Sequence, residues 1–177
     1  MKSKYIYIII IAIVIIIAGI TFYMKNKPTT VILETNMGNI EMQIYSQTPI
    51  TSGNFLSLVN SGFYNGVIFH RIVPGFVIQG GDPTGTGMGG SGKSIPDEIV
   101  PGLSNVRGAV AMANSGPNTG SSQFFINLVN NKFLDGNYPV FGQVTSGMDV
   151  VDKIVAVKID ANGKPFTNVT MIKVYVK

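Results

Sequence analysis

Short apolar-rich stretches recur along the chain after residue 30, and three of them (31–35, 39–44 and 169–176) alternate apolar and polar residues. Alternation with a period of two is typical of strands with one buried face, and turn residues bound the stretches. Two segments instead carry apolar residues at helical spacing: 148–155, and a segment from Pro49 that Gly62 closes, with Thr48 as its expected N-cap. The predicted strands are 31–35, 39–44, 67–72, 76–80, 106–112, 124–129, 140–144 and 169–176. Many short strands with two helices predict a mainly β fold, a closed antiparallel eight-stranded barrel capped by the helices.

The first part of the chain follows a different pattern. Residues 6–24 form an unbroken run of apolar and weakly polar residues without a charge. A helix of that length spans roughly 28 Å, close to the thickness of the hydrocarbon core of a bilayer. The sequence therefore predicts an N-terminal transmembrane anchor at 1–27, bound to the lipid bilayer through residues 6–24, and one domain at 28–177. A cleaved signal peptide is the alternative, although no small-x-small cleavage site follows the run.

The positive charge of the chain belongs to the predicted anchor. Four of the 13 basic residues (Lys2, Lys4, Lys25 and Lys27) flank the apolar run, which leaves nine basic against nine acidic residues in the domain. A neutral domain gives no support for a nucleic-acid partner. Because lysines stand at both ends of the run, the positive-inside rule gives only a small bias. We expect the N-terminus in the cytoplasm and the domain on the extracytoplasmic side.

A glycine-rich stretch at 84–94 contains two patterns that bind nucleotides in other proteins. Residues 85–90 fit GxGxxG, and residues 87–94 fit GxxxxGK[ST]. Both patterns work by placing backbone N–H groups at the start of a helix. Pro96-Asp97-Glu98 follows directly and leaves no room for a long helix. We therefore interpret the stretch as a flexible surface loop.

Few side chains offer conventional catalysis. His70 is the only histidine and there is no cysteine, so we expect no metal site and no cofactor. A Ser-His-Asp set would need His70 to orient Ser121 or Ser122, but strand alternation directs His70 away from the side of Arg71. We favour a packed histidine and a reaction that needs neither a nucleophile nor a proton relay.

Arg71 stands out because it interrupts an apolar strand, where a charge is costly unless it has a function or a partner. Residues two apart share one face of a strand. Phe69 and Arg71 should therefore point the same way, and so should Val77 and Gln79 on the next strand. A structural ion pair is the alternative explanation for Arg71.

Two long stretches carry a family resemblance. Residues 69–83 read FHRIVPGFVIQGGDP and residues 111–126 read AMANSGPNTGSSQFFI, followed by LDG at 134–136 and VFG at 140–142. Together they resemble the cyclophilins, barrel-shaped peptidyl-prolyl cis-trans isomerases, over nearly all of the chain from about residue 31. The resemblance implies an apolar pocket for a proline ring beside a positioned arginine. The catalytic residues so implied are Arg71, Phe76, Gln79, Asn114 and Phe125; the substrate-binding residues are Val77, Ala113, Ser115, Gln123, Phe133, Leu134 and Tyr138.

Rotation about an Xaa-Pro bond is a reaction that such a set could accelerate. The ground state is planar by amide resonance, with a barrier of about 18–20 kcal/mol, and twisting frees a lone pair on the prolyl nitrogen. A donor aimed at that nitrogen binds the transition state more strongly than the substrate. Arg71 is always charged and presents its donors in a fixed fork, so we expect it to be that donor.

Three positions depart from the commonest pattern of the family. Phe133 stands where many cyclophilins have tryptophan, Tyr138 where many have histidine, and Val77 where methionine is frequent. The missing indole N–H should weaken binding of the cyclic peptide cyclosporin, while isomerase activity should survive because Arg71 is present. We expect a monomeric, membrane-anchored isomerase of proline-containing polypeptides. The alternatives are a non-catalytic proline-peptide-binding module, a membrane-tethered chaperone or scaffold, or a structural membrane protein with an inert domain.

Overall fold

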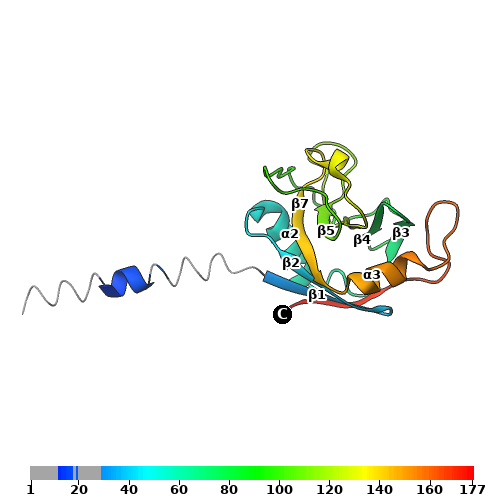
Figure 1. Cartoon of the computed structure of the whole chain (residues 1–177), viewed down its shortest axis with the longest axis horizontal. Helices are drawn as coiled ribbons and strands as arrows, with labels where there is room; N and C mark the ends of the chain where they lie inside the picture. Colours follow the sequence, from blue (N-terminus) through cyan, green and yellow to red (C-terminus); the bar gives the residue numbers. More distant parts are fainter. Residues whose placement is uncertain (1–11, 18, 20–28) are drawn as a thin grey trace, which may run out of the picture.

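The computed structural model describes residues 12–17, 19 and 29–177. From residue 29 onward the chain forms eight strands, two α-helices and one short 3-10 helix (Figure 1). The elements are β1 (Thr29–Thr35), β2 (Gly38–Ile44), α2 (Pro49–Asn60), β3 (Phe69–Val73), β4 (Val77–Gly80), β5 (Ala109–Met112), β6 (Phe124–Asn127), η1 (Lys132–Leu134), β7 (Val140–Ser146), α3 (Met148–Val155) and β8 (Met171–Val176). The predicted mainly β fold with eight strands and helices is confirmed.

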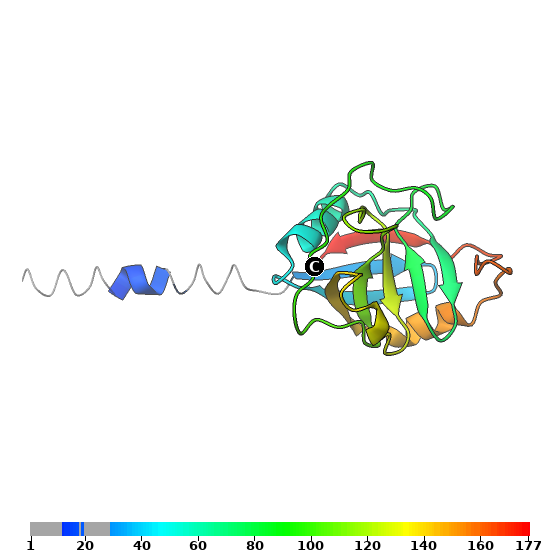
Figure 2. The same cartoon turned by 90° about the horizontal axis from the view of Figure 1, so that it is seen from above.

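All eight strands belong to one antiparallel sheet, in the order β3-β4-β6-β5-β7-β2-β1-β8. The sheet is strongly curled (Figure 2), but its edge strands β3 and β8 do not pair with each other. Within residues 29–177 the two edges meet instead at an isolated bridge between Ile68 and Thr170. The expected closed barrel is therefore wrong, and the sheet is a half-barrel. Gly66, with φ of 82°, turns the chain just before the bridge.

One apolar core fills the interior of the half-barrel. Four aromatic rings meet at its centre, those of Phe55 on α2, Tyr64, Phe124 on β6 and Phe141 on β7. The ring centroid of Phe55 lies 5.1, 5.5 and 5.0 Å from those of Tyr64, Phe124 and Phe141. In both views α2 and α3 lie at opposite ends of the curled sheet, so the helices cover this core from two sides (Figures 1 and 2).

The N-terminus of α2 is capped from a distant part of the chain. Pro49 occupies the first turn as expected, but within residues 29–177 the Thr48 side chain makes no capping hydrogen bond. Its hydroxyl lies 2.8 Å from that of Ser52 instead. Glu98 Oε2 accepts hydrogen bonds from the N–H groups of residues 50 and 51, at 3.0 and 2.9 Å. Thr48 is thus the N-cap residue, as predicted, but the Glu98 carboxylate supplies the capping hydrogen bonds and complements the positive end of the helix.

The predicted anchor lies mostly outside the described residues. Within residues 6–24 the structure describes 12–17 and 19, which are helical and exposed. Among the described residues no helix has the length and apolar character that crossing a bilayer requires. The anchor at 1–27 stays a prediction.

Candidate active site

The middle strands of the sheet carry a second apolar cluster, distinct from the inner core. Its buried members are Val77, Ala109, Ala111, Phe125 and Val140, from β4, β5, β6 and β7. Their sequence neighbours, such as Ile78, Val110 and Phe124, belong to the inner core. Because side chains alternate between the faces of a strand, one sheet builds both the core and an apolar floor on its outer face.

A cavity of about 110 Å³ opens above this outer floor. Its lining consists of Arg71, Phe76, Val77, Gln79, Ala113, Asn114, Phe125, Leu134 and Tyr138. All nine are among the twelve residues that the sequence implied. The Phe125 and Tyr138 rings meet edge to face, with centroids 5.6 Å apart. The cavity is thus a small recess in which apolar side chains lie beside the polar groups of Arg71, Gln79 and Asn114, a combination common in ligand sites.

Arg71 reaches the cavity because β3 contains a β-bulge. Phe69 pairs with Gly80 and Arg71 pairs with Gln79, so one residue of β3 is left over between them. The bulge directs Phe69 into the inner core, where it is fully buried, and Arg71 onto the outer face. The expectation that Phe69 and Arg71 share a face is therefore wrong. The same expectation for Val77 and Gln79 is confirmed, since both line the cavity.

A chain of hydrogen bonds connects Arg71 to the glycine-rich loop. The Arg71 guanidinium donates to Gln79 Oε1 at 3.4 Å, and Gln79 Nε2 donates to Gln123 Oε1 at 2.8 Å. Gln123 Nε2 in turn donates to the carbonyl oxygens of Gly87 and Gly89, at 2.9 and 2.7 Å. Within residues 29–177 Arg71 forms no ion pair, so the structural ion pair considered from the sequence is not formed there.

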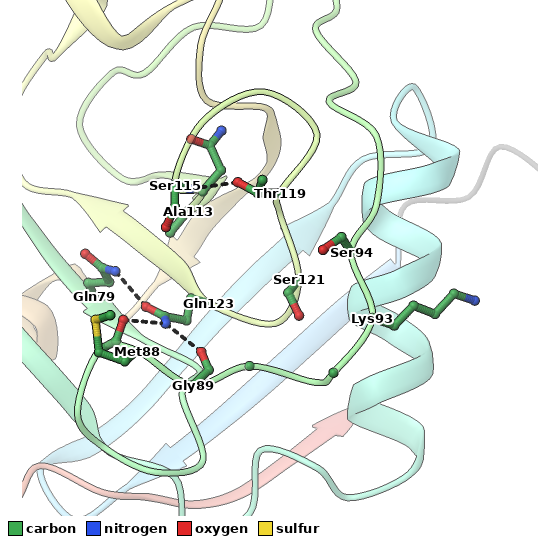
Figure 3. A pocket seen from close by; sticks show the side chains of 14 residues that line it. Gln79, Met88, Gly89, Lys93, Ser94, Ala113, Ser115, Thr119, Ser121 and Gln123 are labelled. Carbon is green, nitrogen blue, oxygen red and sulfur yellow. Dashed lines mark hydrogen bonds between the residues drawn. The ribbon is translucent and has the colours of Figure 1, made fainter.

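A larger cavity of about 430 Å³ adjoins the small one and shares Gln79, Ala113 and Asn114 with it. Figure 3 shows Gln123 between Gln79 and the glycine-rich loop, while the Lys93 side chain points away from them. The remaining lining includes Met88, Gly89, Gly90, Ser94, Ser115, Thr119 and Ser121. The Ser115 N–H donates to Thr119 Oγ1 at 2.8 Å. Backbone and hydroxyl groups make this cavity more polar than the small recess.

Phe133 is the one sequence-implied residue that lines neither cavity. It lies on η1, and its ring stacks on Phe76 with centroids 5.9 Å apart and planes 14° from parallel. The residue is 73% exposed. Phe133 therefore extends the apolar rim outward from Phe76, where it can contact a bound molecule without forming the recess itself.

The glycine-rich loop is organised around the buried side chain of Asp82. The carboxylate accepts hydrogen bonds from the N–H groups of Thr84, Thr86, Gly87 and Gly89. Burial by itself would raise the pKa of Asp82, but these donors outweigh it and hold the pKa well below its usual range. The loop is more constrained than the surface loop expected from the sequence. The backbone N–H groups that a phosphate would need at 87 and 89 are occupied by Asp82.

His70 is buried, and among the described residues neither ring nitrogen has a hydrogen-bond partner. The serines that a catalytic set would need bond elsewhere: Ser122 Oγ donates to Gly81 O, and Ser121 Oγ lies 2.9 Å from Ser91 Oγ. The expected packed histidine is observed. Burial lowers the pKa of His70; Arg71 and Lys164 lower it further, and Asp82 opposes them.

The lowered pKa of His70 predicts a loss of stability in mild acid. Because the folded-state pKa lies below the unfolded value of about 6.5, the folded chain binds fewer protons, so stability is complete above that pH and falls below it. Urea unfolding of the wild type and His70→Gln at about pH 7.5 and about pH 5.5 should show the wild type losing stability relative to the variant at the lower pH. A difference independent of pH would contradict this account.

Comparisons with known proteins agree on one family. A family model described as cyclophilin type peptidyl-prolyl cis-trans isomerase/CLD matches residues 30–176. The chain is 44% identical over 154 residues to peptidyl-prolyl cis-trans isomerase-like 1 of Homo sapiens, covering 84% of this chain and 93% of that protein. The protein of the same name from Rhizopus delemar is 50% identical over 141 residues, with 77% and 86% covered.

Solved structures give the same result. A cyclophilin type peptidyl-prolyl cis-trans isomerase of Cryptosporidium parvum matches with a TM-score of 0.82 and 37% identity, covering 85% of this chain and 98% of that one. A second structure of that protein, in the presence of the dipeptide Ala-Pro, matches with a TM-score of 0.80 and 37% identity over 84% and 98% of the two chains.

Proposed function

The chain belongs to the cyclophilin-type peptidyl-prolyl cis-trans isomerases, and from this premise we propose how its two cavities divide the work of rotating an Xaa-Pro bond. The proline ring enters the small cavity against its apolar side chains, and the peptide that precedes the proline lies along the larger, more polar one. The proposal is supported by the difference between the linings: Phe76, Phe125 and Leu134 give the small cavity an apolar side, whereas the larger cavity around Gln123 is more polar. It is also supported by the solved relative in the presence of Ala-Pro.

Arg71 is the proposed catalytic residue. When the Xaa-Pro bond twists, the prolyl nitrogen loses its resonance with the carbonyl and becomes a hydrogen-bond acceptor. A guanidinium held beside the ring donates to that nitrogen more strongly in the twisted state than in the planar one, which lowers the barrier. One preorganised donor in a water-poor site contributes about 3–4 kcal/mol. The supporting observation is that Arg71 lines the recess and, within residues 29–177, hydrogen-bonds only to the Gln79 amide.

The other site residues act without covalent chemistry in this proposal. Phe76, Val77, Phe125 and Leu134 hold the ring by apolar contact, so that rotation occurs about the bond rather than by movement of the whole proline. Asn114, which borders both cavities, is placed to bind the backbone of the substrate between ring and preceding residues. No cofactor takes part in these steps.

Exchange spectroscopy on an Ala-Pro peptide tests the proposal directly. Adding the full chain at a concentration far below that of the peptide should accelerate cis-trans exchange. The NMR resonances of the cis and trans forms should then broaden and show exchange cross-peaks. Uncatalysed exchange takes tens to hundreds of seconds, so the background is low. Peptide binding without accelerated exchange would support the non-catalytic binding module instead.

The side chain at position 133 should affect the affinity for cyclosporin. The exposed phenyl ring supplies apolar contact but no N–H donor, so we expect weak binding of cyclosporin by the wild type. Phe133→Trp should strengthen that binding about tenfold, since one hydrogen bond is worth about 1 kcal/mol or slightly more. Titration calorimetry checks this, and Phe133→Leu, which restores no donor, is the control. Equal affinity of the Trp and Leu variants would show that the indole donor is not what the wild type lacks.

We further propose that residues 6–24 anchor the enzyme in a bilayer with the domain on the extracytoplasmic side. The support is the uncharged apolar run and its flanking lysines. The chain should sediment with membranes and resist extraction by carbonate, and protease added to intact cells should reach the domain. Recovery of the full-length chain in the soluble fraction would contradict the anchor.

A further inference from the structure

The side chain of Asp82 lies at the end of β4, directly beneath the glycine-rich loop. It is fully buried, and the loop folds around its carboxylate. Thr84 N and Thr86 N donate to it at 2.7 and 3.0 Å, and Gly87 N and Gly89 N donate at 2.7 and 3.1 Å. A Cβ at Gly89 would overlap Asp82 Oδ1, so the loop backbone rests directly on the carboxylate.

The two glycines that donate to Asp82 also face the active site. Their carbonyl oxygens converge on one atom, Gln123 Nε2, at 2.9 Å for Gly87 and 2.7 Å for Gly89. A side-chain amide nitrogen has two hydrogens, and these two carbonyls take both. The amide of Gln123 is therefore held in one orientation, with its oxygen directed at Gln79.

The orientation of the Gln123 amide determines the orientation of the Gln79 amide. Because Gln123 offers its oxygen, Gln79 must present its NH₂ group to Gln123 and its own oxygen to Arg71. If Gln123 were released and turned over, Gln79 could turn over too. Its NH₂ group would then face the guanidinium, which has donors and no acceptor. Arg71 would lose its hydrogen bond within the described residues and with it a fixed position over the recess.

We propose that Asp82 is a positioning residue of the isomerase: by shaping the glycine-rich loop, it fixes the amides of Gln123 and Gln79 and thereby the guanidinium of Arg71. Asp82 contacts no substrate in this account. The inference rests on the catalytic role proposed for Arg71. It assigns the two glycine patterns in the loop to an internal carboxylate rather than to a phosphate.

A double-mutant cycle on the full chain tests the inference. The variants are Asp82→Asn, Gln123→Ala and the double substitution, each assayed for kcat and KM with an Ala-Pro peptide. Displacing a catalytic group by a fraction of an ångström to an ångström costs up to about 100-fold in rate, so we expect Asp82→Asn to lower kcat about tenfold with little change in KM. In the Gln123→Ala background, Asp82→Asn should cause no further loss of kcat, because the link is already cut.

Glu98→Gln is the matched control, because Glu98 also accepts two backbone N–H groups but caps α2, away from both cavities. At a matched folded fraction its kcat should equal that of the wild type. The inference would be overturned if the kcat losses of Asp82→Asn and Gln123→Ala were additive in the double variant. It would also be overturned if Asp82→Asn had the same kcat as Glu98→Gln. Should Asp82→Asn not fold, Gly89→Ala lifts the loop from the carboxylate without removing the charge. It should lower kcat in the same way, and an unchanged kcat would overturn the inference.

Arg71→Ala, measured alongside, separates the catalytic role of Arg71 from the positioning role of Asp82. If Arg71→Ala keeps the wild-type kcat, the proposed mechanism fails together with this inference. If Arg71→Ala is inactive but Asp82→Asn and Gly89→Ala are not impaired, the mechanism stands and only the role of Asp82 is refuted.

Discussion

Replacing Arg71 by alanine is expected to lower kcat/KM for an Xaa-Pro peptide by about 100- to 1000-fold, the usual cost of removing one preorganised donor from a transition state. The loss should fall mainly on kcat, because the guanidinium acts on the twisted bond more than on the planar one. Stability should change little, since Arg71 forms no ion pair within residues 29–177 and makes one long hydrogen bond, to Gln79.

Arg71→Lys is the informative companion to this variant. Lysine keeps the positive charge but lacks the planar fork of donors, so it should recover only a small part of the rate. If lysine restored full activity, charge alone would suffice and the directed hydrogen bond would be unnecessary. An alanine variant as fast as the wild type would remove Arg71 from the mechanism altogether.

Replacing Phe55 by alanine is expected to destabilise the domain by about 3–5 kcal/mol, the range for truncating a buried aromatic residue. The Phe55 ring is fully buried and contacts three other rings at the centre of the core, so its removal leaves a cavity that rigid neighbours cannot fill. Urea unfolding gives the measurement. A loss below about 1 kcal/mol would show that the surrounding core collapses into the space.

Two further measurements make the Phe55 result specific. Phe55→Leu keeps most of the apolar volume and should cost clearly less than alanine. Below the unfolding transition, kcat of Phe55→Ala should stay near the wild-type value, because Phe55 lines neither cavity. A large fall in kcat at full folding would mean that the inner core sets the geometry of the outer face.

Local patterns predicted the elements of the fold well. Alternation or short apolar runs bounded by turn residues located all eight strands, and helical spacing located α3 at its observed bounds, 148–155. The sequence could not reveal the bulge between Phe69 and Arg71, because one extra residue in a strand of five leaves no readable change of period. Local patterns likewise could not predict whether the barrel closes, since closure depends on how the ends of β3 and β8 meet in space.

The site was predicted where motifs identify residues and missed where contacts are non-local. The resemblance named every residue that lines the small cavity. It did not indicate Asp82, whose role depends on a loop folding back over it, nor Glu98, which caps a helix 48 residues earlier in the chain. In the sequence, Asp82 follows a buried strand and precedes small residues. That pattern also fits an ordinary turn, so it did not point to a role for Asp82.

Because neighbouring side chains of β4 and β6 face opposite sides of the sheet, the effect of a substitution depends on which side its position faces. Substitutions at Ile78 and Phe124 meet the interior and should be read out as lowered melting temperature. Substitutions at Val77 and Phe125 face the outer recess and should be read out as altered turnover and altered ligand preference. A library over these two short strands would thus sort into two populations, and catalysts with a reshaped recess could be selected without rebuilding the scaffold beneath them.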